Sequence, residues 1–95
     1  TTNSNLFILN YNKVMTPPLK DGCVDGSMRK LLISIIKNKY EFEEESISEN
    51  DLDICSEVIL SNSTYGVRGI KKINETTYNN SNLYKYLINS LNNLI

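Results

Sequence analysis

The segment DGSMRKLLISIIKNKY, residues 25–40, carries the strongest fold signal in the chain. Its apolar side chains recur at helical spacing and form one wide stripe, made of Met28, Leu31, Leu32, Ile35, Ile36 and Tyr40. Arg29, Lys30 and Lys37 occupy much of the opposite face. Asp25 or Ser27 can cap the first turn, because a short side-chain oxygen accepts from otherwise unpaired backbone amides there. The pattern predicts an amphipathic helix over residues 28–40.

Two later segments show the same periodicity. Residues 48–51 resemble a capping box with Ser48 as N-cap, and Leu52, Cys55, Val58 and Ile59 continue it as a helix of about three turns. Residues 58–60 taken alone equally suit a strand. Leucines at 83, 87, 91 and 94 predict a C-terminal helix capped by Asn80 or Ser81. Ile70 and Ile73 suggest a further short helical piece.

The first 24 residues differ from the rest. Residues 6–9 are four consecutive apolar side chains, and Pro17 and Pro18 exclude a helix, so we expect an extended, strand-like arm followed by a loop over 1–24. Residues 25–95 then form a helical bundle of three to four helices. The predicted fold class is mainly α, in one small domain spanning residues 1–95.

Composition excludes several function classes. The 95 residues carry a net charge of −1 and contain no His, which is the commonest general base and metal ligand. No apolar run approaches the roughly 20 residues of a membrane span. The acidic balance also argues against a broadly basic nucleic-acid surface. We therefore expect no enzyme activity, no catalytic residues, no cofactor and no metal. The start at Thr1 rather than Met leads us to expect a processed segment.

Two cysteines, Cys23 and Cys55, permit one disulfide, and equally suit two reduced thiols. Cys55 lies on the predicted apolar stripe, so we expect it to be buried and helical. Three N-glycosylation triplets begin at Asn62, Asn74 and Asn79. Three is about the number that 14 Asn and 16 Ser or Thr produce by chance, so these triplets permit a secreted glycoprotein without requiring one.

Candidate partner-binding residues lie in two places. Residues 41–57 carry eight acids and no base. The candidate contacts with a basic partner in this segment are Glu43, Glu44, Glu45 and Glu49. Tyr84 and Tyr86 are two residues apart on the C-terminal helix, so one of them must point away from its core face. The alternative is that neither feature binds a partner. The acids would then belong to a solvent-exposed connection between two helices, and the tyrosines would pack at the edge of the core.

Residues 66–72, GVRGIKK, contain a Gly-x-x-Gly turn followed by bases. In outline this resembles the loop of KH RNA-binding domains, although Lys72 stands where that family has an apolar residue. Residues 28–40, then 54–73 with Asn62, then 83–95 are loosely similar to short-chain helical cytokines in the spacing of their helices. The first resemblance implies a small RNA-binding module. The second implies a secreted signalling protein clamped by a Cys23–Cys55 bridge.

The favoured function is a non-enzymatic protein–protein interaction domain, a secreted ligand or an inhibitor, whose partner is another protein. The alternative is an intracellular adaptor or inhibitor in which both thiols are free. An extracellular location is slightly preferred to a cytoplasmic one. Nucleic acid is disfavoured as a partner, and the oligomeric state is not defined by these patterns.

Overall fold

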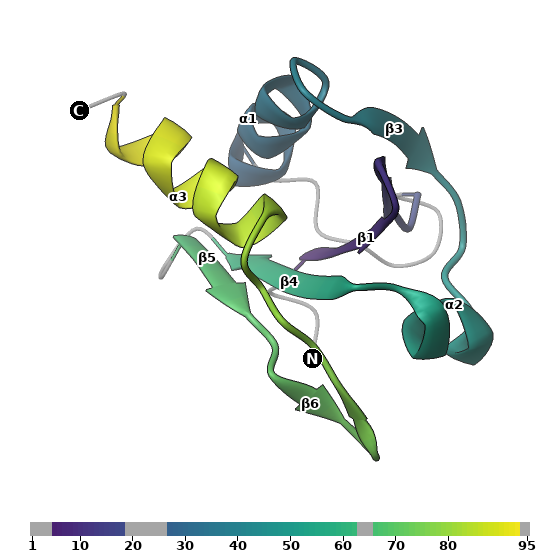
Figure 1. Cartoon of the computed structure of the whole chain (residues 1–95). Helices are drawn as coiled ribbons and strands as arrows, with labels where there is room; N and C mark the ends of the chain where they lie inside the picture. The colour runs from purple at the N-terminus through teal and green to yellow at the C-terminus, as the bar shows by residue number, and fades with distance from the viewer. Residues whose placement is uncertain (1–4, 19–26, 63–65, 94–95) are drawn as a thin grey trace.

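The centre of the fold is a mixed five-stranded sheet with the strand order β3-β2-β1-β4-β5 (Figure 1). The computed structural model describes residues 5–18, 27–62 and 66–93. Within them the five strands are β1 (Asn5–Asn10), β2 (Lys13–Thr16), β3 (Glu41–Glu44), β4 (Glu57–Asn62) and β5 (Gly66–Gly69). Only β2 and β3 are parallel; the other three pairs are antiparallel. The predicted helical bundle over residues 25–95 is therefore wrong.

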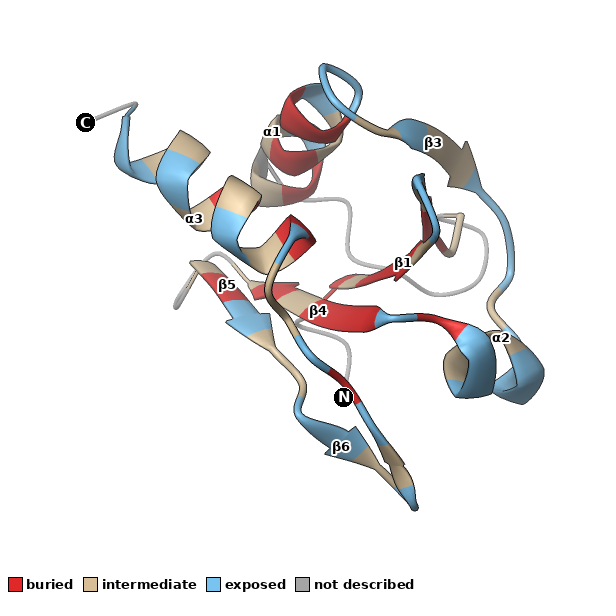
Figure 2. Ribbon diagram, viewed as in Figure 1, coloured by how far each residue is buried: buried red, intermediate tan, exposed pale blue. Residues whose placement is uncertain are grey.

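Two helices, α1 (Ser27–Ile36) and α3 (Leu83–Asn92), pack against one face of this sheet (Figure 1). Figure 2 shows buried residues along β4 and on one side of α1. The core between them is apolar, made of Phe7, Leu9, Val14, Leu32, Ile35, Ile36, Ile59, Val67, Leu83 and Leu87. The predicted apolar stripe of residues 28–36 is thus confirmed as a helix face. The helix ends at Ile36, four residues before the predicted end.

The opposite face of the sheet has a smaller core, formed by Ile8, Met15, Cys55, Val58 and Tyr78. It is covered by α2 (Glu49–Ile54) and by the segment that carries the β6 (Lys72–Ile73) and β7 (Thr76–Thr77) hairpin. Because side chains alternate along a strand, β1 supplies Phe7 and Leu9 to one core and Ile8 to the other. The strand that was predicted as a peripheral arm is therefore the middle strand of the sheet.

The segment 48–62, in which we predicted one helix up to Ile59, forms a short helix followed by a strand. The capping box is confirmed, since the Asp51 N–H donates to the Ser48 hydroxyl and Asp51 accepts from the Ser48 N–H. The helix nevertheless ends at Ile54, and Cys55 is buried but extended rather than helical. Residues 57–61 pair with β1, with Ile59 opposite Phe7. The β-branched residues Val58 and Ile59 suit a strand, and pairing with a distant segment outweighed their helical spacing.

Three other segments predicted as loop, helix or solvated connection are strands. Residues 41–44, three of which are Glu, form the edge strand β3, where charged side chains discourage pairing with other chains. Residues 66–69 form the opposite edge strand β5 rather than a loop. Residues 72–73 form β6, whose turn places Asn74 at φ 53°, a left-handed conformation that Asn tolerates well. No helix in the described ranges is long and apolar enough to span a membrane.

Candidate functional site

A buried arginine connects α1 to the sheet. Arg29 is only 3% exposed, and its guanidinium donates to the Glu44 carboxylate at 2.7 Å and to the Thr16 hydroxyl at 3.3 Å. Thr16 in turn donates to the Leu6 carbonyl. The sequence placed Arg29 on the solvated face of the helix, which is wrong. Its planar, multiply donating group suits a site where one cation must join two strands and a helix.

A fully buried carboxylate holds the start of α3. Glu57 is 0% exposed and accepts hydrogen bonds from the backbone N–H groups of Asn82, Leu83 and Tyr84, at 3.0–3.1 Å. These amides have no partner within the helix, and the positive end of the helix dipole lies there. The Asn82 side chain makes no cap hydrogen bond, so Glu57 takes the role predicted for Asn80 or Ser81.

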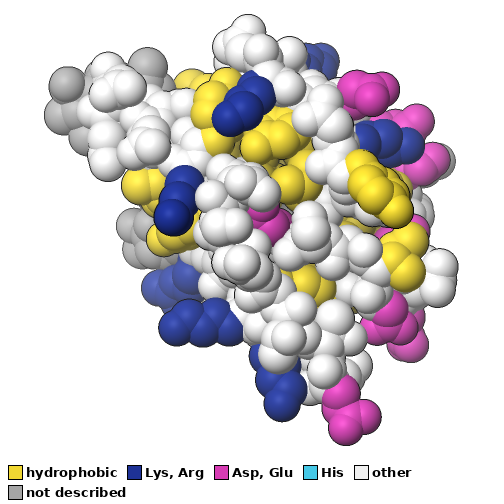
Figure 3. Space-filling model, viewed as in Figure 1, with side chains coloured by type: hydrophobic (Ala, Val, Ile, Leu, Met, Phe, Trp, Pro, Cys, Tyr) yellow, Lys and Arg dark blue, Asp and Glu magenta, His cyan; other side chains and the backbone are white. Residues whose placement is uncertain are grey.

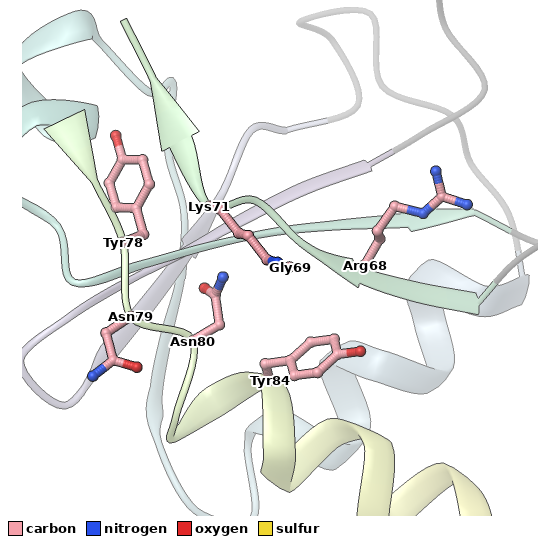
Figure 4. Close-up of a pocket in the computed structure, with 7 residues that line it drawn as sticks. All are labelled: Arg68, Gly69, Lys71, Tyr78, Asn79, Asn80 and Tyr84. Atoms are coloured by element: carbon pink, nitrogen blue, oxygen red, sulfur yellow. The ribbon is translucent and has the colours of Figure 1, made fainter. Parts of the chain in front are cut away.

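The described surface is hollowed on the β5 side, between β5, the loop before α3 and the first turn of α3 (Figure 4). The hollow has a volume of about 470 Å³. Its lining includes the cationic side chains of Arg68 and Lys71, the amide of Asn80 and the ring of Tyr84. In Figure 3, several Lys and Arg side chains lie at the left and bottom of the view, and most Asp and Glu side chains lie at its right, where a further cation lies among them.

A second hollow of about 460 Å³ lies at the turn between β1 and β2. Glu41, Glu45 and Asp51 line it, together with Lys13 and Tyr11. Tyr11 is 94% exposed and has φ 58°, which is uncommon for a residue other than glycine. This hollow is predominantly acidic and lies beside the acids that the sequence assigned to a basic partner.

Those acids do not form one surface. Glu43 pairs with Lys13, and this hydrogen bond lowers the pKa of Glu43 and raises that of Lys13. Glu44 pairs with the buried Arg29. Glu45 lines the acidic hollow, and Glu49 lies exposed in the first turn of α2. Two of the four acids therefore have structural partners within the described residues.

The two candidate tyrosines also separate. Tyr86 donates from its hydroxyl to the Ile35 carbonyl at 2.9 Å and packs edge-to-face against Tyr40, with ring centroids 5.8 Å apart. The Lys39 ammonium lies 4.9 Å from the centroid of the Tyr86 ring. These contacts connect α3 to the end of α1, and burial raises the pKa of Tyr40. Tyr84 faces the hollow beside β5 (Figure 4).

The described modification candidates lie at the end of β4, in the hairpin of β6 and β7, in the loop before α3 and in the second core. Asn62 ends β4 and is half-buried, whereas Asn74 and Asn79 are exposed. Cys55 is a buried free thiol, and Cys23 lies outside the described residues. The disulfide and the use of the three glycosylation triplets stay predictions.

Burial raises the pKa of the Cys55 thiol to about 11. Since only the thiolate is nucleophilic, we expect alkylation of Cys55 by iodoacetamide at pH 8 to be at least roughly tenfold slower than that of an exposed thiol. The rate should rise as the pH approaches 11, and peptide mass spectrometry would follow it. Rapid labelling at pH 8 in the folded protein would contradict this expectation.

No group of His, Cys, Asp or Glu side chains within the described ranges is placed to hold a metal ion. The described lysines are equally unsuited to covalent catalysis. Six of them are exposed, namely Lys30, Lys37, Lys39, Lys71, Lys72 and Lys85. The seventh, Lys13, has a pKa raised by its hydrogen bond to Glu43, whereas a lysine that attacks a carbonyl needs a lowered one.

Comparison with known proteins identifies the fold. A family model described as amino-transferase class IV matches residues 1–73, well over half of the chain. The chain belongs to the class IV aminotransferase family. A probable branched-chain-amino-acid aminotransferase from Thermotoga maritima is 29% identical over 76 residues, which cover 79% of this chain and 28% of that protein.

Solved structures agree with this class IV assignment. A putative 4-amino-4-deoxychorismate lyase from Legionella pneumophila is 29% identical, with a TM-score of 0.85 over 95% of this chain and 34% of that one. A branched-chain aminotransferase from Thermoproteus uzoniensis, solved with norvaline, is 24% identical and shares the fold, with a TM-score of 0.90 over 97% of this chain and 31% of that one. The chain spans about a third of the length of these proteins.

The class IV assignment overturns the functional predictions made from the sequence. A non-enzymatic interaction domain, a secreted ligand or inhibitor, a cytokine-like signal and an RNA-binding module are all wrong, because the relatives are enzymes. The missing base and metal ligands misled the prediction, since a third of an enzyme fold need not contain its catalytic set. The preferences for a protein partner and for an extracellular location stay predictions.

Sequence reasoning also missed the two buried charges, Arg29 and Glu57. One signal was available for Glu57: if residues 58–60 form a strand, Glu57 shares a face with Ile59 and Ser61. An acid on the buried face of a strand needs a fixed partner. No comparable local signal marks Arg29, because its partners Thr16 and Glu44 are 13 and 15 residues away in the sequence.

Proposed function

We propose that this chain forms part of a pyridoxal-phosphate-dependent enzyme that transfers the amino group of a small apolar amino acid. The family match over residues 1–73 carries the proposal. The 29% identity to a probable branched-chain-amino-acid aminotransferase supports the substrate class. Pyridoxal phosphate would supply the electron sink that amino-group chemistry requires.

The described residues do not fit covalent attachment of this cofactor, because six of their seven lysines are exposed and the pKa of the seventh, Lys13, is raised by its hydrogen bond to Glu43. The attachment lysine is therefore assigned to the part of the enzyme outside these residues. What this chain supplies is the rigid sheet and helix layer, held by Arg29 between β2 and β3 and by Glu57 beneath α3. Rigid elements of this kind position a site more precisely than loops do.

A second candidate activity is a lyase that acts on 4-amino-4-deoxychorismate. The Legionella pneumophila lyase is as similar to this chain, at 29% identity, as the aminotransferase from Thermotoga maritima is. Both activities belong to enzymes of the same fold, because one scaffold can support several reactions through differences at its site.

One experiment tests both activities. The complete polypeptide that carries this chain is purified with pyridoxal phosphate, and bound cofactor is measured by its visible absorption. Amino transfer from leucine to a 2-oxo acid is then compared with consumption of 4-amino-4-deoxychorismate in the absence of any amino acceptor. We expect cofactor binding and transfer from leucine. Consumption of the chorismate derivative alone would favour the lyase, and a protein that binds no cofactor would contradict both candidates.

A further inference from the structure

The covers of the two faces of the sheet differ in how much they bury. On the first face, α1 and α3 are each ten residues long and supply to the apolar core Leu32, Ile35, Ile36, Leu83 and Leu87. On the second face, α2 has no buried residue, and Tyr78 is the one buried residue of the described segment 70–82. Segments that bury little open locally at a low cost in free energy. The cover of the second face is therefore the weaker of the two.

Residues 70–82, which we call the strap, leave β4 and return to it. At one end, the Ile70 N–H donates to the Val58 carbonyl at 2.8 Å. At the other end, the Asn82 N–H donates to the Glu57 carboxylate at 3.1 Å. Between these two points, β6 and β7 pair with each other in a separate two-stranded sheet (Figure 1). A hairpin this short is marginally stable by itself, so the middle of the strap depends on its contacts with α2 and the second core.

Tyr78 fastens the middle of the strap. Its side chain is 8% exposed and belongs to the second core, and its hydroxyl donates to the Leu52 carbonyl of α2 at 2.6 Å. The Thr76 hydroxyl adds a hydrogen bond to the Asp53 carboxylate, at 3.3 Å and exposed to solvent. Water competes for an exposed hydrogen bond, so this second contact contributes less. Tyr78 thus connects the strap, the second core and α2 through one side chain.

We infer that the strap and α2 open together while α1, α3 and the five-stranded sheet stay folded, and that the Tyr78 hydroxyl is the fastening that keeps them closed. The two segments open as one unit because the Leu52 carbonyl accepts both from the Tyr78 hydroxyl and from the Cys55 thiol. Opening exposes the thiol, which is 7% exposed in the closed form. The strap therefore controls when the second core meets solvent, whichever of the two proposed activities the enzyme has.

Cys55 is a built-in reporter of this opening. Tyr78→Phe keeps the ring but removes the hydroxyl that donates to Leu52. In the complete polypeptide, we expect iodoacetamide at pH 8 to alkylate Cys55 about tenfold faster in this variant, because loss of one buried hydrogen bond shifts the opening equilibrium by about that factor. Peptide mass spectrometry separates Cys55 from any other cysteine. An unchanged alkylation rate would show that the hydroxyl fastens nothing, and would overturn the inference.

Tyr86→Phe is the matched control, since it makes the same chemical change on the first face. The Tyr86 hydroxyl donates to the Ile35 carbonyl at 2.9 Å and so connects α3 to α1. Its loss should alter the alkylation rate of Cys55 by less than about twofold, because neither helix covers the second core. Equal acceleration in the two variants would show that Cys55 is reached only through global unfolding, and would refute a local opening.

Hydrogen exchange tests whether the strap and α2 open as one unit. Each contains a protected amide: the Tyr78 N–H donates to the Lys71 carbonyl at 2.9 Å, and the Cys55 N–H at the end of α2 donates to the Asp51 carbonyl at 3.1 Å. In Tyr78→Phe, both amides should exchange faster by about the same factor, whereas the amides within α1 and α3 should keep their rates. Faster exchange in the strap alone would refute the joint opening.

Discussion

Replacement of Glu57 by alanine should lower the free energy of unfolding by about 3 kcal/mol, since it leaves three helix amides without their acceptor and opens a buried space. The Glu57 carboxylate accepts from the N–H groups of Asn82, Leu83 and Tyr84, and no part of its side chain reaches solvent. The loss should fall on α3, which Glu57 connects to β4. Urea unfolding of the complete polypeptide, followed by circular dichroism, measures the change.

Two further variants show whether the charge or the shape of Glu57 matters. Glu57→Gln keeps the shape but loses the negative charge at the positive end of the helix, so its cost should lie between zero and that of Glu57→Ala. Glu49→Gln also changes an acid in the first turn of a helix, but Glu49 is exposed and should contribute less than about 0.5 kcal/mol. A Glu57→Ala protein as stable as Glu49→Gln would show that water replaces the carboxylate.

Removal of Glu44 should destabilise the protein more than removal of its partner Arg29. Glu44→Ala leaves a guanidinium that is 3% exposed with only the Thr16 hydroxyl, at 3.3 Å, and should cost about 2–3 kcal/mol. Arg29→Met removes the buried charge itself, and the remaining Glu44 side chain, 48% exposed, can be hydrated. The Arg29→Met substitution should therefore lower the free energy of unfolding by only about 1 kcal/mol, even though it removes the ion pair with Glu44.

The double variant Arg29→Met with Glu44→Ala should be close in stability to Arg29→Met alone, because no buried charge remains to be satisfied. Glu43→Ala provides the control, because Glu43 lies on the same strand as Glu44 but pairs at the surface with Lys13 of the neighbouring strand β2. That pair is exposed to solvent, so its loss should not change the urea midpoint measurably. If Arg29→Met proves the more damaging substitution, packing of the arginine rather than its charge governs this contact.

Local features were predictable where neighbouring residues determine them. The apolar stripe of α1, the capping box of Ser48 and Asp51, and the C-terminal helix all depend on residues within four positions of one another. Each of these predictions is confirmed at least in part. The misplaced ends of α1 and α3 are the ordinary consequence of helix termini being set by contacts beyond the periodic residues.

The strands could not be predicted in the same way. β4 carries an apolar spacing that suits a helix as well as a strand, and its choice depends on β1, about 50 residues earlier in the chain. The acidic β3 has no apolar alternation and is a strand because it pairs with β2 and because Lys13 and Arg29 meet its carboxylates. Such partners are invisible in the local pattern.

The candidate site shows the same contrast between what neighbouring residues determine and what contacts between distant segments determine. The sequence noted the bases of residues 68–72, but assigned them to a loop that binds RNA. The fold places Asn80 against Gly69, directs Tyr84 to the same hollow and engages Glu57 with the helix start. These residues come from segments separated by 10 or more positions, so only the folded chain brings their donors and acceptors together.

The sequence by itself thus determined where helices can begin and which of their faces are apolar, because both properties arise within one or two turns. The tertiary structure decided which ambiguous segments became strands, which charges were buried and which side chains share a hollow. Pairing between β1 and β4 satisfies a row of backbone hydrogen bonds and buries Phe7, Ile8, Val58 and Ile59 together. That gain in burial exceeds the small local preference of residues 55–59 for a helix.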